Sequence, residues 1–189
     1  MTLIAAKPQV TPDDLLNLDE QGLFELVDGK LVEKQMSYLS GKTAVLVSAK
    51  LFSYVSANRL GDVLSETSFR CFPDDPDKIR RPDIAFITAS RALANPPEGH
   101  IAIAPDIAIE IVSPNDKIYE MDEKLADYRA AGVKFIWVIN PQSRIIRAYG
   151  PDHYLTELFD GDTLRGDPVL PGFAIAVQEL LPNPVRQAT

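Results

Sequence analysis

The sequence predicts an α/β or α+β protein in which helices flank a central sheet. A helical pattern over 117–131 lies between two apolar runs typical of buried strands, at 106–112 and 135–139. Asp28-Gly29 lies between two strand-like segments and is a strong signal for a hairpin turn. A helix between strands, with hairpins on either side of it, indicates helices packed on a sheet.

The first half of the chain predicts two helices and several short strands. Thr11 followed by Pro12 is typical of a helix start, and this helix should end near Leu18. Apolar residues recur at a helical spacing over 42–58, and Gly61 is the expected stop. The other elements expected here are hairpin strands at 24–27 and 30–34, a strand that opens at 63–64, another strand at 66–72, and a turn at 73–78.

The second half has a clearer pattern of strands around one helix. Gly132 is well suited to end the helix at 117–131. Asn140-Pro141-Gln142-Ser143 turns the buried strand 135–139 into a strand at 144–149. The remaining segments expected are strands at 83–88 and 106–112 separated by a loop at 92–99, and tail strands near 154–158 and 173–177.

Length and composition are those of one globular domain. The chain has 189 residues, 46% of them hydrophobic and 24% charged. We expect a single domain over 11–181 with flexible termini at 1–10 and 182–189. No run approaches the roughly 18 apolar residues of a membrane span, and we find no signal-peptide pattern at the N-terminus. We therefore expect a cytoplasmic protein without membrane partners.

Cysteine, histidine and net charge exclude several classes of site. The single cysteine, Cys71, cannot form an internal disulfide or a cysteine-based zinc site, and two histidines leave little for a transition metal. The net charge of −8 argues against broad, non-specific nucleic-acid binding. Two sets of basic residues could still form a local groove or could be scattered surface charge. They are Lys78, Arg80 and Arg81, and Lys117, Lys124, Arg129 and Lys134.

Two carboxylates interrupt otherwise apolar strand segments. Asp83 opens the run 84–87, and Glu110 lies between Ile109 and Ile111. A carboxylate buried in such a place costs several kcal/mol unless it has a partner such as a metal ion or a lysine. Asp83 could instead cap its strand, and Glu110 could be a core carboxylate paired with a lysine alone. On neighbouring strands, the two would form a site for a hard cation.

A lysine on the helix at 117–131 is a candidate partner for these carboxylates. Ile118, Met121, Leu125 and Tyr128 form the predicted buried stripe of this helix, with Tyr128 expected in the core. Lys124 lies about 60° from the centre of the stripe, at about 100° per residue. Such a lysine either leans inward or extends its ammonium group to water.

Several other residues are weaker candidates. Trp137 lies in an apolar run and is expected in the core, whereas His100 and His153 are expected at the surface. Ser113 lacks a glycine elbow, so a serine hydrolase is not indicated, and no phosphate-binding glycine loop is present. Glu25 lies in a hairpin strand, where a solvated face is the alternative to a site role.

Six short motifs in order resemble one known family over about residues 11–181. They are Glu25-Leu26-Val27-Asp28-Gly29, Pro82-Asp83, Glu110-Ile111-Val112-Ser113-Pro114, Lys124 with Tyr128 and Gly132-Val133, Trp137-Val138-Ile139-Asn140-Pro141, and Leu170-Pro171-Gly172-Phe173. This series resembles the Uma-two-like restriction endonuclease family, within the restriction-endonuclease-like superfamily that carries the PD-(D/E)XK active site. The resemblance implies a mixed central sheet flanked by helices.

The resemblance also implies a magnesium-dependent site for phosphodiester hydrolysis, with Mn²⁺ as a possible substitute. Asp83 and Glu110 would be metal ligands, and the carbonyl group of Ile111 would add a third. The usual lysine two residues after Glu110 is replaced by Val112, and Lys124 fits the place to which it moves in this family. Glu25 is implied to lie near the site. Gly41-Lys42 stands where many members have a histidine, so no role is assigned there.

The implied activity is an endonuclease acting on nucleic acid, with DNA the expected substrate and a homodimer the expected assembly. Phosphodiester hydrolysis increases the charge on the phosphoryl oxygens, which a metal ion and a lysine can stabilise. Two other classes remain open. One is a catalytically silent nuclease fold that acts as a binding or oligomerisation module, and the other is a structural partner of a separate DNA-recognition protein.

Overall fold

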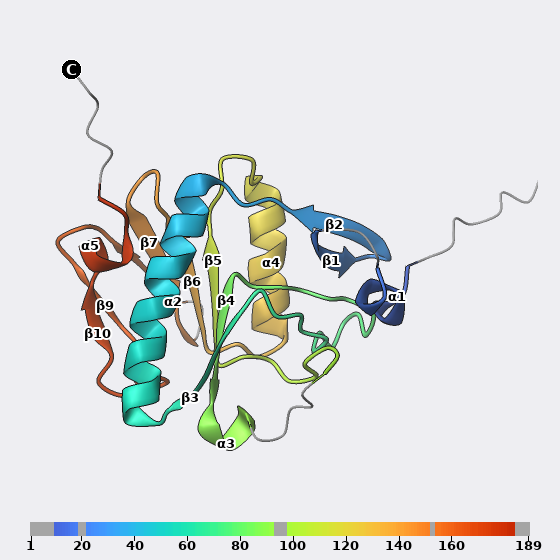
Figure 1. The fold of residues 1–189 in the computed structure, drawn as a ribbon, viewed down its shortest axis with the longest axis horizontal. Coiled ribbons are helices and arrows are strands. Elements are labelled where there is room, and N and C mark those ends of the chain that lie inside the picture. The colour runs from blue at the N-terminus through green and yellow to red at the C-terminus, as the bar shows by residue number, and fades with distance from the viewer. Residues whose placement is uncertain (1–9, 19–21, 93–97, 152–153, 184–189) are drawn as a thin grey trace, which may run out of the picture.

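A six-stranded mixed sheet forms the centre of the structure, a computed structural model that describes residues 10–18, 22–92, 98–151 and 154–183 (Figure 1). Its strand order is β3-β4-β5-β6-β7-β8. Neighbouring strands are antiparallel except β5 and β6, which are parallel. The strands are β3 (Gly61–Ser65), β4 (Ile84–Thr88), β5 (Ile107–Ile111), β6 (Phe135–Asn140), β7 (Ile145–Tyr149) and β8 (Leu155–Leu158).

Helix α4 (Ile118–Ala130) makes the crossover that a parallel pair such as β5 and β6 requires. The predicted fold class, a mixed sheet flanked by helices, is therefore confirmed. The remaining elements are α1 (Pro12–Leu16), β1 (Leu23–Val27), β2 (Lys30–Lys34), α2 (Tyr38–Asn58), α3 (Ala89–Ala92), β9 (Thr163–Arg165), β10 (Ala174–Ala176) and α5 (Val177–Leu180).

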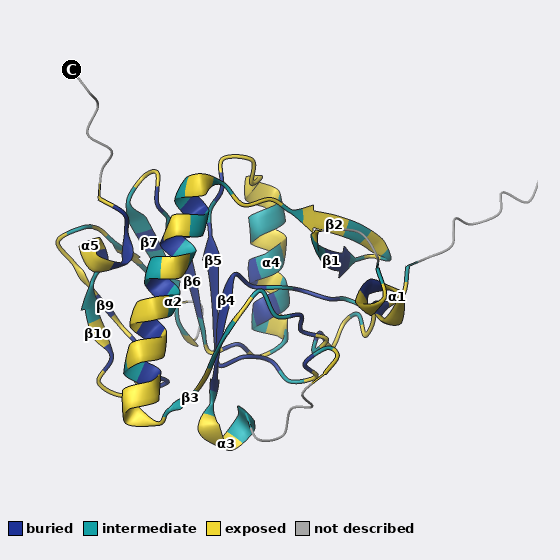
Figure 2. Ribbon diagram, viewed as in Figure 1, coloured by how far each residue is buried: buried dark blue, intermediate teal, exposed yellow. Residues whose placement is uncertain are grey.

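The pleat of the central strands divides the core into two layers. In β4, Ile84 and Phe86 belong to the cluster that includes α2, whereas Ala85 and Ile87 belong to the cluster that includes α4. Successive side chains of a strand point to opposite faces, so this division follows from alternation alone. Figure 2 shows the result: β4 and β5 are buried, and α2 exposes the side that faces away from the sheet.

Local sequence signals explain the limits of the two long helices. Ser37 caps α2 in a reciprocal pair with Ser40, which starts the helix at Tyr38, four residues before the predicted start. Helix α4 ends next to Gly132, whose φ of 84° is a conformation that glycine adopts readily. The prediction for the end of α4 is thus confirmed.

The predicted hairpin forms a separate two-stranded sheet beside the central one (Figure 1). Asp28 and Gly29 both have positive φ, as a tight hairpin turn requires. Leu26 exchanges backbone hydrogen bonds with Ile79 at 3.0 and 2.8 Å. Leu26 and Ile79 are fully buried together with Leu15 of α1. This apolar contact fixes the hairpin against the segment that leads into β4.

Two predictions about local structure were wrong. The segment 66–72 is not a strand: Glu66 has a φ of 49°, which bends the chain after β3, and Phe69 makes only isolated bridges. Ile118 is 81% exposed rather than part of the buried stripe, because it is the first residue of α4. Leu125 and Tyr128 form the buried part of the stripe.

Other expectations concern the ends of the chain and the membrane. Residues 1–9 and 184–189, most of the expected flexible termini, lie outside the described residues, and the single domain over 11–181 stays a prediction. Most of the expected loop at 92–99 also lies outside the described residues. Helix α3 ends at Ala92, the first residue of that expected loop. In the described ranges, no helix has the length and apolar character needed to cross a membrane.

Gly61 joins α2 to the sheet in a conformation that other residues adopt only with strain. Its φ is 150°, and a Cβ at this position would lie 2.0 Å from the carbonyl oxygen of Ile87. We predict that Gly61→Ala lowers the free energy of unfolding by at least about 1–3 kcal/mol, measured by urea denaturation. The control is Gly161→Ala, because a Cβ there would meet nothing within 4 Å. Equal stability of the two variants would contradict the prediction.

Candidate active site

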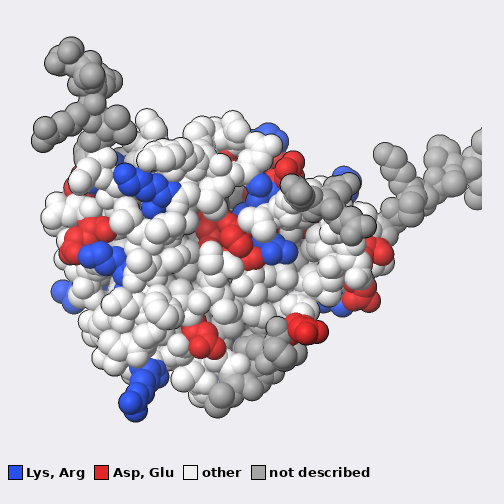
Figure 3. All heavy atoms as spheres, in the orientation of Figure 1, with Lys and Arg blue, Asp and Glu red and all other residues white. Residues whose placement is uncertain are grey.

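A cavity of about 260 Å³ opens between the β1–β2 hairpin, the first turns of α4 and the adjoining ends of the central strands. The charged residues that line it include Glu25, Lys34, Glu66, Asp83, Glu110 and Lys124. Figure 3 shows acidic and basic side chains close together near the middle of this face, between α2 and the hairpin. The structure thus brings together the four side chains that the sequence suggested, Glu25, Asp83, Glu110 and Lys124.

Asp83 lies immediately before β4 and is 5% exposed. Since Ile84 pairs with Ile109 across the antiparallel strands, Asp83 stands beside Glu110. Its Oδ2 accepts a hydrogen bond from the backbone N–H of Ile111, and its Oδ1 accepts one from Lys34 at 2.7 Å. The strand-cap alternative is insufficient, because this carboxylate binds the neighbouring strand and a lysine.

Glu110 lies inside β5 on the face that α4 covers, and it is 2% exposed. Tyr128 donates a hydrogen bond to its Oε1 at 2.6 Å, and Lys124 donates to its Oε2 at 3.3 Å. Burial is the largest effect on Glu110 and raises its pKa, and the nearby charge of Asp83 raises it further. Lys124 lowers the pKa, but by less, and the net shift is upward. Tyr128 is in the core as predicted, and it also holds the Glu110 side chain.

Glu25 reaches the same cluster from β1 and is fully buried. Its Oε1 lies 3.2 Å from the ammonium group of Lys124 and accepts the backbone N–H of Arg81 at 3.0 Å. Arg80 donates to its Oε2 at 3.0 Å. Burial raises the pKa of Glu25, but Lys124, Arg80 and Lys34 outweigh burial and the pKa is lowered. The alternative of a solvated strand face is wrong.

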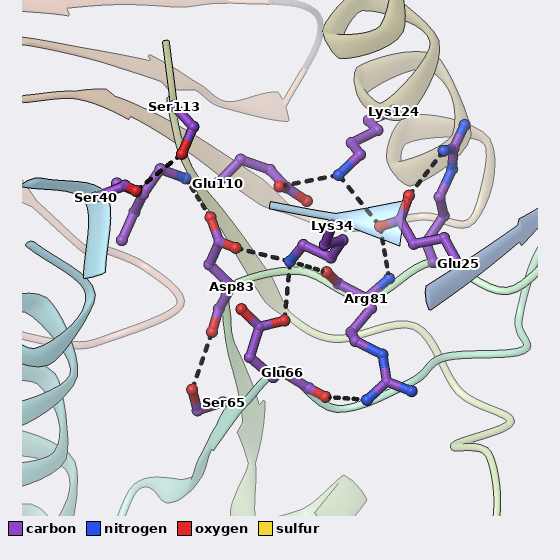
Figure 4. Close-up of polar contacts among 12 residues, drawn as sticks. Glu25, Lys34, Ser40, Ser65, Glu66, Arg81, Asp83, Glu110, Ser113 and Lys124 are labelled. Carbon is purple, nitrogen blue, oxygen red and sulfur yellow. Dashed lines mark hydrogen bonds and ion pairs between the residues drawn. The ribbon is translucent and has the colours of Figure 1, made fainter. Parts of the chain in front are cut away.

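Lys124 leans inward between Glu25 and Glu110, with its side chain 15% exposed (Figure 4). Burial lowers the pKa of this lysine, but the attraction of Glu110 and Glu25 is larger and raises it. Lys124 therefore carries a positive charge inside the site. The alternative in which it extends to water is wrong.

Lys34 and Glu66 are members of the cluster that the sequence analysis missed (Figure 4). Lys34 binds both Asp83 and Glu66, and burial raises the pKa of Glu66 to about 7 despite the opposing effect of Lys34. The hairpin register pairs Glu25 with Val32, so Lys34, two residues further on, shares the face of Glu25. The Asp28-Gly29 turn could have revealed this register; nothing in the sequence marks Glu66.

The first set of basic residues does not form a groove. Arg80 is buried and donates to Asp127 as well as to Glu25, and Lys78 also binds Asp127 at 2.7 Å. Arg81 donates to the backbone carbonyl groups of residues 24 and 66. The groove interpretation is therefore wrong for this set. In the second set, Lys117 pairs with Glu120, Lys134 pairs with Asp106, and Arg129 lies over the ring of Tyr149.

Among the described residues, Trp137, Ser113 and His100 form no ion pair or hydrogen bond with the charged side chains of the cluster. Trp137 is in the core as predicted, at 1% exposure. Ser113 lines the cavity, but its hydroxyl group lies 2.8 Å from that of Ser40, which is not the general base that a serine nucleophile needs. His100 is half-buried, with its ring nitrogens near Ser68 and the carbonyl group of residue 12, so its assignment to the surface was wrong. His153 lies outside the described residues.

The donor chemistry of the site fits a hard divalent cation. Asp83 and Glu110 offer carboxylate oxygens side by side, and Ile111 lines the same cavity. Oxygen donors of this kind suit Mg²⁺, which is usually held by one or two carboxylates and keeps several waters. In the described part of the chain, no three His, Cys, Asp or Glu residues form a metal cluster by themselves. A backbone carbonyl group and water would have to complete the ligand set.

A comparison with known protein families shows to which of them this chain belongs. Residues 12–178 match Uma2, a family described as "Putative restriction endonuclease". The chain belongs to the Uma2 family. The predicted resemblance is thereby confirmed, and the motifs quoted above all lie within the matched residues.

The fold is also similar to a solved structure. This is the 1.96 Å crystal structure of a "putative nuclease belonging to DUF820" from Anabaena variabilis ATCC 29413. The two have a TM-score of 0.76 and 22% sequence identity, over 90% of this chain and 97% of the other. At this identity the likeness supports the fold alone. A comparison with curated proteins found no match.

The buried ion pair between Arg80 and Glu25 holds one side of this Uma2 site in place. We predict that Arg80→Met lowers the free energy of unfolding by about 3–5 kcal/mol, because Glu25 and Asp127 lose their buried partner. The control is Arg70→Met. Its partner Asp77 is 55% exposed, so the change should stay within about 1 kcal/mol. Urea denaturation measures both, and equal losses would contradict the prediction.

Proposed function

We propose that this Uma2 protein is a metal-dependent endonuclease that hydrolyses phosphodiester bonds of nucleic acid, with DNA as the expected substrate. The observation that carries the proposal is the meeting of Asp83, Glu110 and the charged Lys124 in one cavity. Its family, described as a restriction endonuclease family, supports a nuclease, and the structural neighbour supports the fold.

Asp83, Glu110 and the carbonyl group of Ile111 would hold Mg²⁺, or Mn²⁺ in its place. When bound, such an ion polarises a phosphoryl oxygen and lowers the pKa of a coordinated water. The ion would also offset the carboxylates around it, which would otherwise repel the phosphate group of a substrate. The backbone N–H of Ile111 keeps Asp83 oriented, and the Tyr128 hydroxyl group does the same for Glu110.

Lys124 would stabilise the charge that grows on the phosphoryl oxygens, or orient the attacking water. Its ammonium group lies next to Glu110, the proposed metal ligand, and remains charged. A fixed charge in a buried site needs no rearrangement during the reaction, which makes it effective. Glu25 would position Lys124 from the other side at 3.2 Å.

One observation favours a second function, the catalytically silent binding or oligomerisation module. All four carboxylate oxygens of Asp83 and Glu110 accept hydrogen bonds from the protein itself. In such a protein these contacts would serve stability alone, and no divalent ion would bind.

We also propose a homodimer. Strands β3 and β8 form the edges of the central sheet, and exposed edges are commonly covered or paired. Tyr154, Leu155 and Phe159 are exposed in and next to β8. Light scattering should then give about twice the 20.9 kDa chain mass at micromolar concentration, and a monomer mass would contradict this.

The metal site can be tested directly by calorimetric titration with Mg²⁺ and Mn²⁺. We predict that Asp83→Asn weakens binding by more than roughly ten-fold, because it removes the charge of a direct ligand while keeping an oxygen for the N–H of Ile111. The matched control is Asp62→Asn in the exposed part of β3, which should bind like the wild type. Equal affinity of Asp83→Asn and the wild type would remove Asp83 from the site.

Cleavage of plasmid, single-stranded DNA and RNA in the presence of Mg²⁺ or Mn²⁺ tests the enzyme. We predict that Lys124→Met lowers the rate by about 10²–10³, because a charge that stabilises the transition state is lost while the side-chain stem is retained. Lys50→Met is the matched control, since Lys50 is 44% exposed, pairs with Glu179 and does not line the cavity. Glu110→Ala is the inactive control.

Two results would overturn these assignments. Wild-type cleavage no greater than that of Glu110→Ala on every substrate would reject the nuclease function for the isolated protein and favour the silent module. Undiminished cleavage by Lys124→Met would reject the role of Lys124 alone.

A further inference from the structure

Lys34 lies in a cage of three oxygen atoms. Its ammonium nitrogen is 2.7 Å from Oδ1 of Asp83, 2.9 Å from Oε2 of Glu66 and 2.7 Å from the carbonyl oxygen of Arg81. The side chain is 12% exposed. An ammonium group has three N–H donors, and here each has its own acceptor. The group is therefore held as a fixed positive charge (Figure 4).

The cage has the same donor types as the proposed metal position. One set consists of Asp83, Glu66 and the carbonyl group of Arg81, and the other of Asp83, Glu110 and the carbonyl group of Ile111. Each set is two carboxylates and a backbone carbonyl group, and Asp83 belongs to both. A carboxylate shared between two cation positions is the arrangement expected of sites that bind two metal ions a few ångström apart.

The carboxylates of the site attract Lys34 more strongly than an exposed partner at the surface would. Burial lowers the pKa of Lys34, but the attraction of Glu110, Asp83 and Glu66 outweighs it and raises the pKa. Glu110, the largest of these attractions, makes no hydrogen bond to Lys34 and acts through space. The ammonium group thus offsets the same carboxylates that a divalent ion would offset.

We propose that the ammonium group of Lys34 takes the place of a second metal ion. The site then binds one divalent ion, between Asp83 and Glu110, and Lys34 supplies the neighbouring positive charge from the hairpin. This inference rests on the proposed metal-dependent function. It assigns Lys34 as a residue that sets the number of metal ions and positions Asp83.

The cage would remain able to bind a cation after Lys34 is removed. Glu66 has a second oxygen, Oε1, that is buried and has no hydrogen-bond partner among the described residues. Without the ammonium group, Glu66 and Asp83 would face each other as two carboxylates at the same cavity. A hard divalent ion is the species that such a pair of carboxylates attracts.

The test counts bound Mn²⁺ ions per chain, by calorimetry and by the electron paramagnetic resonance signal of free Mn²⁺. We expect one ion for the wild type and two for Lys34→Met. The double variant Lys34→Met with Glu66→Gln should return to one ion, because the cage loses a carboxylate. The matched control is Lys30→Met, which changes an exposed lysine in the same strand and should bind one.

Each other outcome is decisive. One ion in both the wild type and a folded Lys34→Met variant overturns the inference, and so do two ions in the wild type; both leave the proposed function standing. No ion in the wild type overturns the proposed function itself. If circular dichroism shows that Lys34→Met is unfolded, the number of Mn²⁺ ions bound by the single variant Glu66→Gln decides the question instead. Retention of the single ion supports the inference, and its loss makes Glu66 a metal ligand and overturns it.

Discussion

Glu110 places a carboxylate in the central strand β5 with only 2% of its surface exposed, and much of the surrounding structure compensates for that charge. Glu25 and Asp83 are buried within the same cluster. Isolated buried ions cost several kcal/mol each, so each carboxylate needs donors close by. Helix α4 contributes Tyr128 and Lys124, and the other donors come from the hairpin and from the segment before β4. Ion pairs and hydrogen bonds to these carboxylates thus hold helix, hairpin and sheet together, in addition to apolar packing.

The part of this arrangement that depends on local pattern could be predicted from sequence. Asp83 and Glu110 stand out because one directly precedes an apolar strand segment and the other interrupts one, and strand alternation places Glu110 on the side of α4. Helix periodicity likewise places Lys124 beside the buried stripe. The family resemblance supplied the position of Glu25, which its strand alone left open to solvent.

The other features of the site and fold depend on contacts between residues far apart in sequence, which the spacing of apolar residues cannot predict. Lys34 looks like an ordinary charged residue in a hairpin strand until docking brings it to Asp83. Arg80 looks like part of a basic patch until Asp127 of α4 and Glu25 of β1 meet it. The wrong strand at 66–72 has the composition of a strand, but a left-handed residue at Glu66 bends the backbone away. Helix position, rather than periodicity, left Ile118 exposed.

The separate hairpin has a consequence for how the protein folds. Its two strands form from neighbouring residues, yet Lys34 meets Asp83 across 49 positions of sequence and Glu25 meets Arg80 across 55. Such distant contacts form slowly because long loops must close first. Until the hairpin docks, Asp83 and Glu66 lack the ammonium group of Lys34. Any ligand that recognises the assembled cluster therefore binds the native state selectively and shifts the folding equilibrium toward it.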